Sequence, residues 1–288
     1  MKNVIMGCGD VGRRIVRHLL ANEFKASEIA AYVNSQTSRE LALALDVVAQ
    51  VIDLDALNDD LSTCNGAQLY YTIAPQKSGQ TDQRTQAILN QFDASHVRPA
   101  KVVLISTTGV YGDCGGNWVD EMSPVNPGTD RGKRRLDSEQ RWLAWGQTQS
   151  ISVVVLRVPG IYAFSRIPHE RLAKRTPVVR AEECGFTNRI HADDLARVCV
   201  VAMNRANNAE IFNVTDGSPG TISEYLKEAA EVVGLPSLPE ISMQQAQTLL
   251  SKGMLSYLGE SRKISNKKML RELGLELLYP DFRQGLLA

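Results

Sequence analysis

The sequence predicts an α/β fold, a doubly wound parallel sheet with a small α/β lobe toward the C-terminus. Two observations predict it. Short runs rich in Val, Ile and Leu alternate with segments of helical periodicity, which is typical of a parallel sheet covered by helices on both faces. Most of these apolar runs end in a polar or glycine-containing loop, where such sheets bind their ligands. Hydrophobic residues make up 43% of the 288 residues, enough to bury a sizeable core.

The first element is a strand, Lys2–Met6, that runs into the loop Gly7-Cys8-Gly9-Asp10-Val11-Gly12 and then into an amphipathic helix. Strand, G-x-G-x-x-G and helix in this order form the dinucleotide-binding fingerprint. Gly7 permits the tight turn, Gly9 lets a pyrophosphate approach the backbone, and Gly12 lets the helix pack closely on the strand. We therefore assign all six loop residues to a cofactor site. The alternative is a glycine turn in a fold that binds nothing.

The second strand, Glu28–Val33, ends where an NAD-binding fold places an acidic side chain on the ribose 2′-hydroxyl. No carboxylate is present in the segment that follows. Asn34, Ser35 and Arg39 offer an amide, a hydroxyl and a guanidinium instead, which suit a 2′-phosphate better. The sequence therefore favours NADP(H) over NAD(H). The alternative is that Arg39 begins the solvated face of the next helix.

The alternation of strands and helices continues through the next part of the chain. Its elements are strands at Val47–Ile52, Ala67–Ile73 and Lys101–Ile105 and a helix over residues 82–95. Asp53 and Leu54 follow the first of these strands and are placed to border the adenine. Ile73 and Ala74 end the second, and we assign them to the same cofactor site.

A polar, glycine-rich loop is predicted over residues 113–130, followed by a helix over residues 131–148. The sixth strand is Ser152–Val158, and Pro159-Gly160-Ile161 at its end completes the predicted cofactor site.

The chain is predicted to form two parts. The sheet domain spans residues 1–162, and a helix and a strand over residues 188–214 return to it. Residues 163–187 and 215–288 form the small substrate lobe, with short helices and a strand or two.

Several of these stretches, taken together, resemble the extended short-chain dehydrogenase/reductase family, the NAD-dependent epimerase/dehydratase group. They are the Gly7 loop, Ser106–Gly112, Arg157–Tyr162, Arg189–Asp194, Phe212–Val214, Ser265-Asn266 and Leu273-Gly274. The resemblance implies a Rossmann-type domain that binds NAD(P) and a C-terminal substrate lobe. It also implies nucleotide sugars or related small polar carbonyl compounds as substrates, and a homodimer.

The chemistry of this family uses a Tyr and a Lys, four residues apart, on the helix after the fifth strand. By the resemblance, Thr107 holds the substrate oxygen, and Thr108 is the neighbouring candidate. The Tyr and Lys positions hold Arg131 and Arg135, whereas a shifted register restores a lysine at Lys133 but no tyrosine. Because arginine stays protonated in proteins, it cannot act as the base. The chain thus resembles an atypical subgroup that lacks the Tyr-x-x-x-Lys pair.

The absence of the Tyr-x-x-x-Lys pair leaves two alternative functions. The chain is an NADP(H)-dependent epimerase, dehydratase or reductase in which Lys133, Tyr111 or Tyr162 supplies acid/base function, or it is a regulatory protein that holds NADP(H) without turnover. Tyr111 and Tyr162 are expected at strand ends facing the site, although such tyrosines more often pack on the cofactor or close a turn.

The cationic stretch Arg131-Gly132-Lys133-Arg134-Arg135 lies near a helix start, where positive charge is disfavoured. One interpretation is a solvated face whose partners are Asp120, Glu121 or Asp130. The other is a site for a substrate phosphate or carboxylate near the nicotinamide, so that the small-molecule substrate is an anion.

Composition and motifs exclude several other classes. The formal net charge is zero and the pI is about 6.9, so no nucleic-acid partner is expected. No apolar run approaches the roughly 20 residues of a membrane span, and the initial strand leaves no room for a signal peptide. Five scattered cysteines fit a cytoplasmic setting without zinc, with Cys8 the one expected to be accessible. The stretch around His191 is expected to begin a helix rather than to bind a metal.

Overall fold

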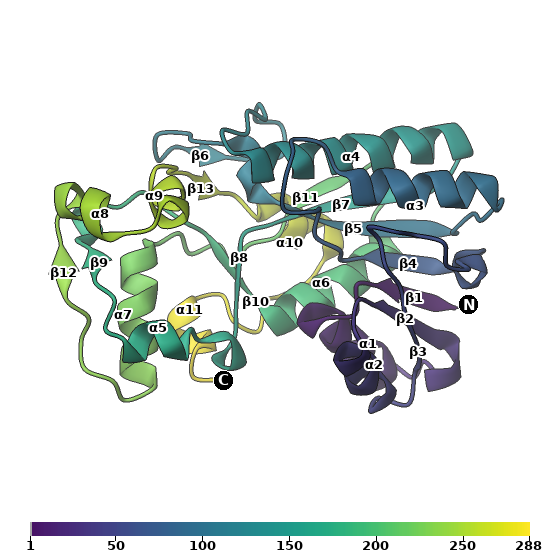
Figure 1. Ribbon diagram of the computed structural model, residues 1–288, viewed down its shortest axis with the longest axis horizontal. Coiled ribbons are helices and arrows are strands. Elements are labelled where there is room, and N and C mark those ends of the chain that lie inside the picture. Colours follow the sequence, from purple (N-terminus) through teal and green to yellow (C-terminus); the bar gives the residue numbers. More distant parts are fainter. Residues whose placement is uncertain (1) are drawn as a thin grey trace.

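The computed structural model describes residues 2–288, with the side chain of Lys252 left out, so Met1 of the predicted sheet domain lies outside the described residues. Seven parallel strands form the central sheet in the order β11-β7-β5-β4-β1-β2-β3 (Figure 1). They are β1 (Asn3–Met6), β2 (Ile29–Val33), β3 (Val48–Val51), β4 (Gln68–Tyr71), β5 (Lys101–Thr107), β7 (Ser152–Val158) and β11 (Ile211–Asn213). The strand order reverses between β1 and β4, and the carboxyl ends beside this point are where such sheets bind ligands.

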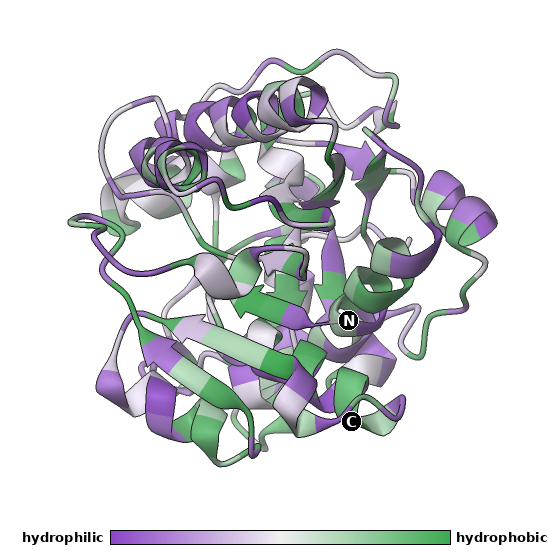
Figure 2. Ribbon diagram, turned by 90° about the vertical axis from the view of Figure 1, so that its right-hand side faces the viewer, coloured by the Kyte–Doolittle hydropathy of each residue, from purple (hydrophilic) through white to green (hydrophobic). Residues whose placement is uncertain are grey.

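Helices cover both faces of the sheet because side chains alternate along each strand. Ile5 packs in one apolar cluster, with helices α1 (Asp10–Ala21), α2 (Gln36–Leu43) and α6 (Ala192–Arg205). Its neighbours Val4 and Met6 pack in another, against α3 (Gln83–Ala94) and α4 (Asp130–Gln149). Apolar residues accordingly concentrate on the strands in Figure 2, and polar residues on the outer turns of the helices. The predicted α/β fold with a doubly wound parallel sheet is confirmed.

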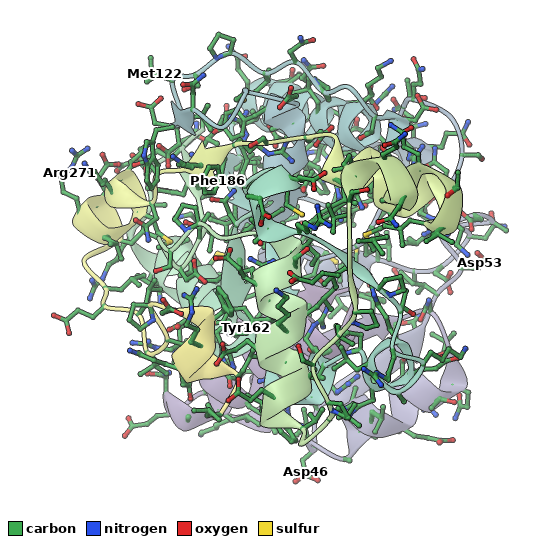
Figure 3. The ribbon with its side chains drawn as sticks, turned by 90° about the vertical axis from the view of Figure 1, so that its left-hand side faces the viewer. Asp46, Asp53, Met122, Tyr162, Phe186 and Arg271 are labelled. Atoms are coloured by element: carbon green, nitrogen blue, oxygen red, sulfur yellow. The ribbon has the colours of Figure 1, made fainter. Side chains whose placement is uncertain are left out.

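The remaining elements lie mostly beyond the carboxyl ends of the strands, on the left of Figure 1 and toward the viewer in Figure 3. Two short parallel pairs there are β8 (Gly160–Tyr162) with β10 (Arg189–His191) and β9 (Val178–Val179) with β12 (Glu240–Ile241). The helices are α5 (His169–Ala173), α7 (Ile222–Val232), α8 (Met243–Leu249), α9 (Lys252–Leu258) and α11 (Phe282–Gly285). Two apolar clusters of their own hold these elements together.

Three segments differ from their local sequence pattern. Within the predicted loop 113–130, β6 (Trp118–Val119) pairs with β13 (Lys263–Ile264), a partner too distant in sequence for a local pattern to indicate. Helix α10 (Lys267–Leu273) adds buried side chains to the cluster around β1, so this part of the predicted lobe packs with the sheet. The stretch 189–191 is a strand, and α6 begins only after it.

Single-turn 3-10 helices complete the chain: η1 (Ala26–Glu28), η2 (Ser62–Cys64), η3 (Thr108–Tyr111), η4 (Phe164–Arg166) and η5 (Ala181–Glu183). Within residues 2–288, no helix combines the length and the apolar character needed to cross a membrane.

Candidate functional site

The glycine loop between β1 and α1 has the geometry of a phosphate cradle. Gly7 has φ +96°, and a Cβ on it would lie 2.8 Å from the side chain of Ile73, so no other residue fits without strain. A Cβ on Gly12 would lie 3.0 Å from Ile5, which is how α1 packs so closely on β1. Beside Gly9, by contrast, the nearest atom to a Cβ would be 3.9 Å away. The open space at Gly9 therefore suits the close approach of a ligand to the backbone.

The side chains of two other loop residues, Cys8 and Asp10, are held by the protein itself. The Cys8 side chain is fully buried, and burial raises the pKa of its thiol to about 11. The expectation that Cys8 is accessible is therefore wrong, although its backbone remains in the loop. The Asp10 carboxylate accepts a hydrogen bond from Arg166 of η4 at 2.8 Å and from Arg14 of the same helix at 3.4 Å. These contacts connect the start of α1 to the segment that follows β8.

Next to the glycine loop, a cavity of about 540 Å³ opens at the carboxyl ends of β1, β2, β3 and β4, and we call it the dinucleotide cavity. Eight predicted cofactor residues line it: Gly7, Cys8, Gly9, Asn34, Asp53, Leu54, Ile73 and Ala74. Lining residues that sequence reasoning did not single out include Tyr32, Ser38, Asp55, Thr72 and Arg84. Strands separated in sequence supply these groups, so only the sheet order brings them together.

Of the cofactor residues predicted before β5, five do not line this cavity: Asp10, Val11, Gly12, Ser35 and Arg39. The Arg39 guanidinium donates instead to the carbonyl of Ala49 at 3.0 Å. The Ser35 hydroxyl caps α2 by accepting the backbone N–H of Ser38 at 3.2 Å. Arg84 of α3, which the sequence did not indicate, lies at the cavity in a two-bond ion pair with Asp55 at 2.6 and 2.7 Å.

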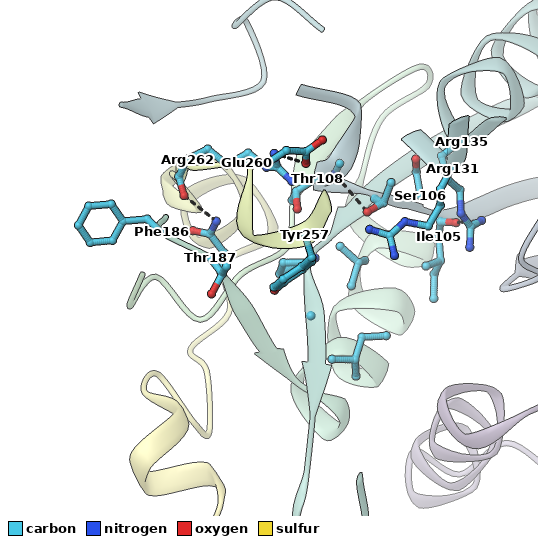
Figure 4. A pocket seen from close by; sticks show the side chains of 17 residues that line it. Ile105, Ser106, Thr108, Arg131, Arg135, Phe186, Thr187, Tyr257, Glu260 and Arg262 are labelled. Atoms are coloured by element: carbon cyan, nitrogen blue, oxygen red, sulfur yellow. Dashed lines mark hydrogen bonds and ion pairs between the residues drawn. The ribbon is translucent and has the colours of Figure 1, made fainter. Parts of the chain in front are cut away.

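A second cavity, of about 260 Å³, lies at the carboxyl ends of β5 and β7, and we call it the substrate cavity (Figure 4). Thr107, Thr108, Arg131 and Arg135 line it together with Pro159, Gly160 and Ile161. The structure thus brings four predicted catalytic residues to the three cofactor residues that follow β7. Lys133 and Tyr111 do not line it.

Arg135 forms hydrogen bonds to one residue of each cavity. Its Nη1 atom donates to the carbonyl oxygen of Ile73 at 2.9 Å and to that of Ile105 at 3.0 Å, at the ends of β4 and β5. Burial lowers the pKa of this guanidinium, the nearby Asp82 and Glu139 oppose that shift, and the positive charge of Arg131 adds to it. Because an arginine pKa normally lies above 12, the group nevertheless remains a cation.

Behind the substrate cavity lies a buried polar network that accounts for Tyr111. Glu139 of α4 accepts hydrogen bonds from Ser106 and from Arg157, whose closest contact is 2.9 Å. Arg157 also donates to the Tyr111 hydroxyl at 3.0 Å, and that hydroxyl donates to Asn213 Oδ1 at 2.8 Å. Since burial also raises the pKa of Tyr111, this tyrosine is a poor proton donor for a ligand in the cavity.

Tyr162 is also outside both cavities. Its ring is buried and packs edge-on against His191 at 5.2 Å between ring centroids. Burial raises the pKa of its hydroxyl. The structure therefore brings neither of the two tyrosines considered as proton donors to a ligand cavity.

The lobe contributes residues to the substrate cavity that sequence reasoning missed. Tyr257 of α9, together with Glu260 and Arg262 after it, lines the cavity opposite the strand ends (Figure 4). Arg262 donates to Glu260 at 2.8 Å, and its carbonyl oxygen accepts a hydrogen bond from Asn188 at 3.1 Å. No motif marks these residues, because their place depends on how the lobe packs onto the sheet.

The stretch around His191 serves as a helix cap. His191 Nδ1 accepts the backbone N–H of Asp193 at 3.2 Å, and the Asp194 carboxylate accepts the N–H groups of Leu278 and Tyr279 at 2.8 and 2.9 Å. Among the described residues, no group of three or more His, Cys, Asp or Glu side chains is arranged to hold a metal ion.

The glycine loop, the switch of strand order and the two adjoining cavities define a nucleotide-binding α/β protein of the Rossmann type. More specifically, the chain belongs to the NAD dependent epimerase/dehydratase family, whose model matches residues 4–215. A comparison with curated proteins gave no match.

Solved structures match over nearly the whole chain. A functionally unknown conserved protein from Silicibacter pomeroyi DSS is 28% identical with a TM-score of 0.85, over 99% of this chain and 96% of that one. A UDP-glucuronic acid 4-epimerase from Bacillus cereus in complex with NAD is 19% identical with a TM-score of 0.77, over 100% and 97%. A dTDP-glucose 4,6-dehydratase from Streptomyces venezuelae, DesIV double mutant with NAD and DAU bound, is 19% identical with a TM-score of 0.76, over 100% and 95%. At 19% identity the last two show the fold alone.

Proposed function

We propose that this chain is an NAD(P)-dependent epimerase, dehydratase or reductase that acts on a small polar carbonyl or hydroxyl compound through an atypical set of catalytic residues. The observation that carries the proposal is that both cavities lie at the same edge of the sheet, the dinucleotide cavity beside the glycine loop and the substrate cavity beside the threonines after β5. Membership of the family supports the nicotinamide cofactor.

The residues present fit such a cofactor. The open space at Gly9 and the N-terminus of α1 would hold the pyrophosphate, and Asp53 and Leu54 would border the adenine. Pro159, Gly160 and other residues after β7 would hold the nicotinamide, which supplies or accepts a hydride when bound.

The preference for NADP(H) over NAD(H) stays a prediction. It rested on three residues, of which Asn34 lines the dinucleotide cavity, whereas Ser35 and Arg39 do not. Asp53 and Asp55, which do line it, bring carboxylates that would repel a 2′-phosphate close to them. A comparison of NADH and NADPH affinities decides the question directly.

The family's Tyr and Lys are replaced, in our alignment, by Arg131 and Arg135, and the lining of the substrate cavity by both residues supports that alignment. Neither can exchange a proton near neutral pH. Tyr257 lines the same cavity and carries a titratable hydroxyl, so we assign proton transfer to Tyr257. Thr107 and Thr108 would hold the substrate oxygen at the end of β5.

The test has two stages. Titration with NADH and NADPH, followed by nicotinamide fluorescence, measures cofactor binding, which we expect for at least one of them. A panel of small carbonyl and hydroxyl compounds then tests turnover, and Tyr257→Phe is expected to lower kcat by about 10²- to 10⁴-fold with the cofactor affinity unchanged. Tyr279→Phe, a tyrosine outside both cavities, is the matched control. Absence of binding to either dinucleotide would refute the proposal.

A second candidate function is a regulatory protein that holds the dinucleotide without turnover. The observation that favours it is the occupation of both family positions by arginines that cannot transfer protons. Tight cofactor binding with no turnover of the whole panel, and no gain of turnover in Arg131→Tyr, would favour this function over the enzyme.

A further inference from the structure

The first two turns of α4 carry four cations that point to different places. Arg134 is buried and donates to the carbonyl of Gly79. Lys133 lines neither cavity. Arg131 and Arg135, four residues apart and therefore on one face of the helix, both line the substrate cavity (Figure 4). The helix thus directs two of its four charges to the same small space.

Those two charges lack a carboxylate partner. Within residues 2–288, Arg131 and Arg135 form no ion pair, and the Arg131 side chain forms no hydrogen bond. The acidic side chain in the lining, Glu260, is already paired with Arg262 at 2.8 Å. The cavity therefore holds an excess of positive charge.

The acidic residues that the sequence offered as partners for these cations are engaged elsewhere. Asp120 accepts the hydroxyl of Ser123 at 3.0 Å, and Glu121 accepts the backbone N–H of Asn213 at 2.7 Å. Asp130 accepts the side-chain amide of Gln80 at 2.8 Å. In the described part of the chain, none of the three forms an ion pair with Arg131 or Arg135, so the proposed partners are wrong, whereas Arg131 itself is exposed, as the interpretation of a solvated face expects.

Two like charges four residues apart on a helix repel each other even in solvent. This repulsion between the two cations is stronger where burial reduces screening by solvent, as it does around Arg135. An anion between the two guanidinium groups would turn this repulsion into attraction. Guanidinium groups also match the planar carboxylate and the phosphate in hydrogen-bond geometry.

The size of the cavity limits the ligand. Its volume of about 260 Å³ lies below the roughly 300–1,000 Å³ of sites that enclose drug-sized molecules, and the nicotinamide would share it. The group that binds inside the cavity is therefore small. Thr107 and Thr108 add hydroxyl groups beside the cations, suited to an oxygen next to the anionic group.

We propose that the substrate is a small organic acid whose carboxylate or phosphate group is bound by Arg131 and Arg135, next to the carbonyl or hydroxyl held at Thr107 and Thr108. This inference deepens the proposed function, and it rests on that function where it calls the bound anion a substrate. Anion binding itself can be measured without turnover.

The experiment is calorimetric titration of the cofactor-free protein with oxalate and with inorganic phosphate at low ionic strength. Arg131→Gln removes one charge from an exposed position and is expected to weaken binding of the preferred anion by about 10- to 100-fold, as for loss of a charged hydrogen bond. Lys133→Gln makes the same change of charge on the same helix outside the cavity, and is expected to change the affinity less than about twofold.

Tighter binding of either anion supports the site. A preference for oxalate indicates a substrate with a carboxylate, and a preference for phosphate indicates a phosphorylated substrate. Equal weakening in the two variants would overturn the proposal, since it would indicate diffuse screening, and so would the absence of wild-type binding below about 10 mM. Parallel NADH and NADPH titrations separate the two proposals. Dinucleotide binding without anion binding overturns only this inference, and anion binding without dinucleotide binding overturns only the cofactor function.

Discussion

Two glycines of the same loop, Gly9 and Gly12, are expected to respond in opposite ways to the same substitution. At Gly12 an added Cβ would lie 3.0 Å from Ile5 and 3.1 Å from the carbonyl oxygen of Gly7, both parts of the packed interior. At Gly9 it would meet no atom closer than 3.9 Å, although the backbone angles, φ −78° and ψ −146°, lie outside the main regions of other residues. Gly12→Ala therefore tests packing, and Gly9→Ala tests the ligand space.

The expected magnitudes differ accordingly. Overpacking at Gly12 lowers the free energy of unfolding by about 1–3 kcal/mol. Gly9→Ala lowers it by about 1 kcal/mol, because no neighbouring atom opposes the methyl group and the cost comes only from the unusual ψ of −146°. If phosphates approach the loop at Gly9, the methyl group displaces them and removes at least one charged hydrogen bond of about 1.5–3 kcal/mol. The dinucleotide dissociation constant then rises about 10- to 150-fold.

Urea unfolding measures the stability of both variants, and nicotinamide fluorescence measures their affinity for NADH and NADPH. The reasoning is refuted if Gly9→Ala binds the preferred dinucleotide as tightly as the wild type, because the cradle is then not where the phosphates lie. It is also refuted if Gly12→Ala unfolds at the wild-type urea concentration, because the close approach of α1 to β1 would then carry no energetic cost.

Three further predictions concern stability and pH. Glu139→Gln should lower the free energy of unfolding by about 3–5 kcal/mol in urea, because it leaves the buried Arg157 charge without its partner. Burial raises the pKa of Asp216 to about 7, so between about pH 4 and pH 7 the folded state binds more protons than the unfolded state. Stability should therefore fall by up to roughly 4 kcal/mol as the pH rises through that window, and Asp216→Asn should remove this contribution. Trp142 lies on the fully buried face of α4, and Trp142→Ala should lower the free energy of unfolding by about 3–5 kcal/mol.

Each of these three has a contradicting result. A Glu139→Gln variant as stable as the wild type would mean that Arg157 finds another partner. Equal pH dependence of unfolding in the wild type and in Asp216→Asn between pH 4 and 7 would show that this carboxyl titrates normally. A loss below about 1 kcal/mol for Trp142→Ala would mean that the core collapses to fill the space.

The sequence alone determined those parts of the site that lie within one local pattern. The strand, glycine loop and helix at the N-terminus follow from periodicity and from the steric demands on Gly7, Gly9 and Gly12, all within a few residues of one another. The ends of the parallel strands were equally predictable, because connectivity places them on one edge of the sheet. Asp53 and Pro159 therefore line the cavities as the sequence indicated.

Side-chain direction was less predictable. Arg39 and Ser35 follow the right strand but bond to the backbone of β3 and α2 instead of facing the cavity. Tyr111 follows the right strand too, yet its hydroxyl is held inside the protein by Arg157 and Asn213. For Ser35 the bond is a local helix cap, whereas for Arg39 and Tyr111 the partner lies on another strand, and no local pattern records such a bond.

Only the tertiary structure decided which residues of the lobe line the substrate cavity. Tyr257, Glu260 and Arg262 reach it because the apolar clusters of the lobe fix α9 above the sheet, and because β13 pairs with β6. The same packing leaves Arg131 and Arg135 facing a small cavity without a carboxylate partner. Local propensity determines strands, helices and loops, but which charges remain unpaired depends on contacts between segments that are far apart in the chain.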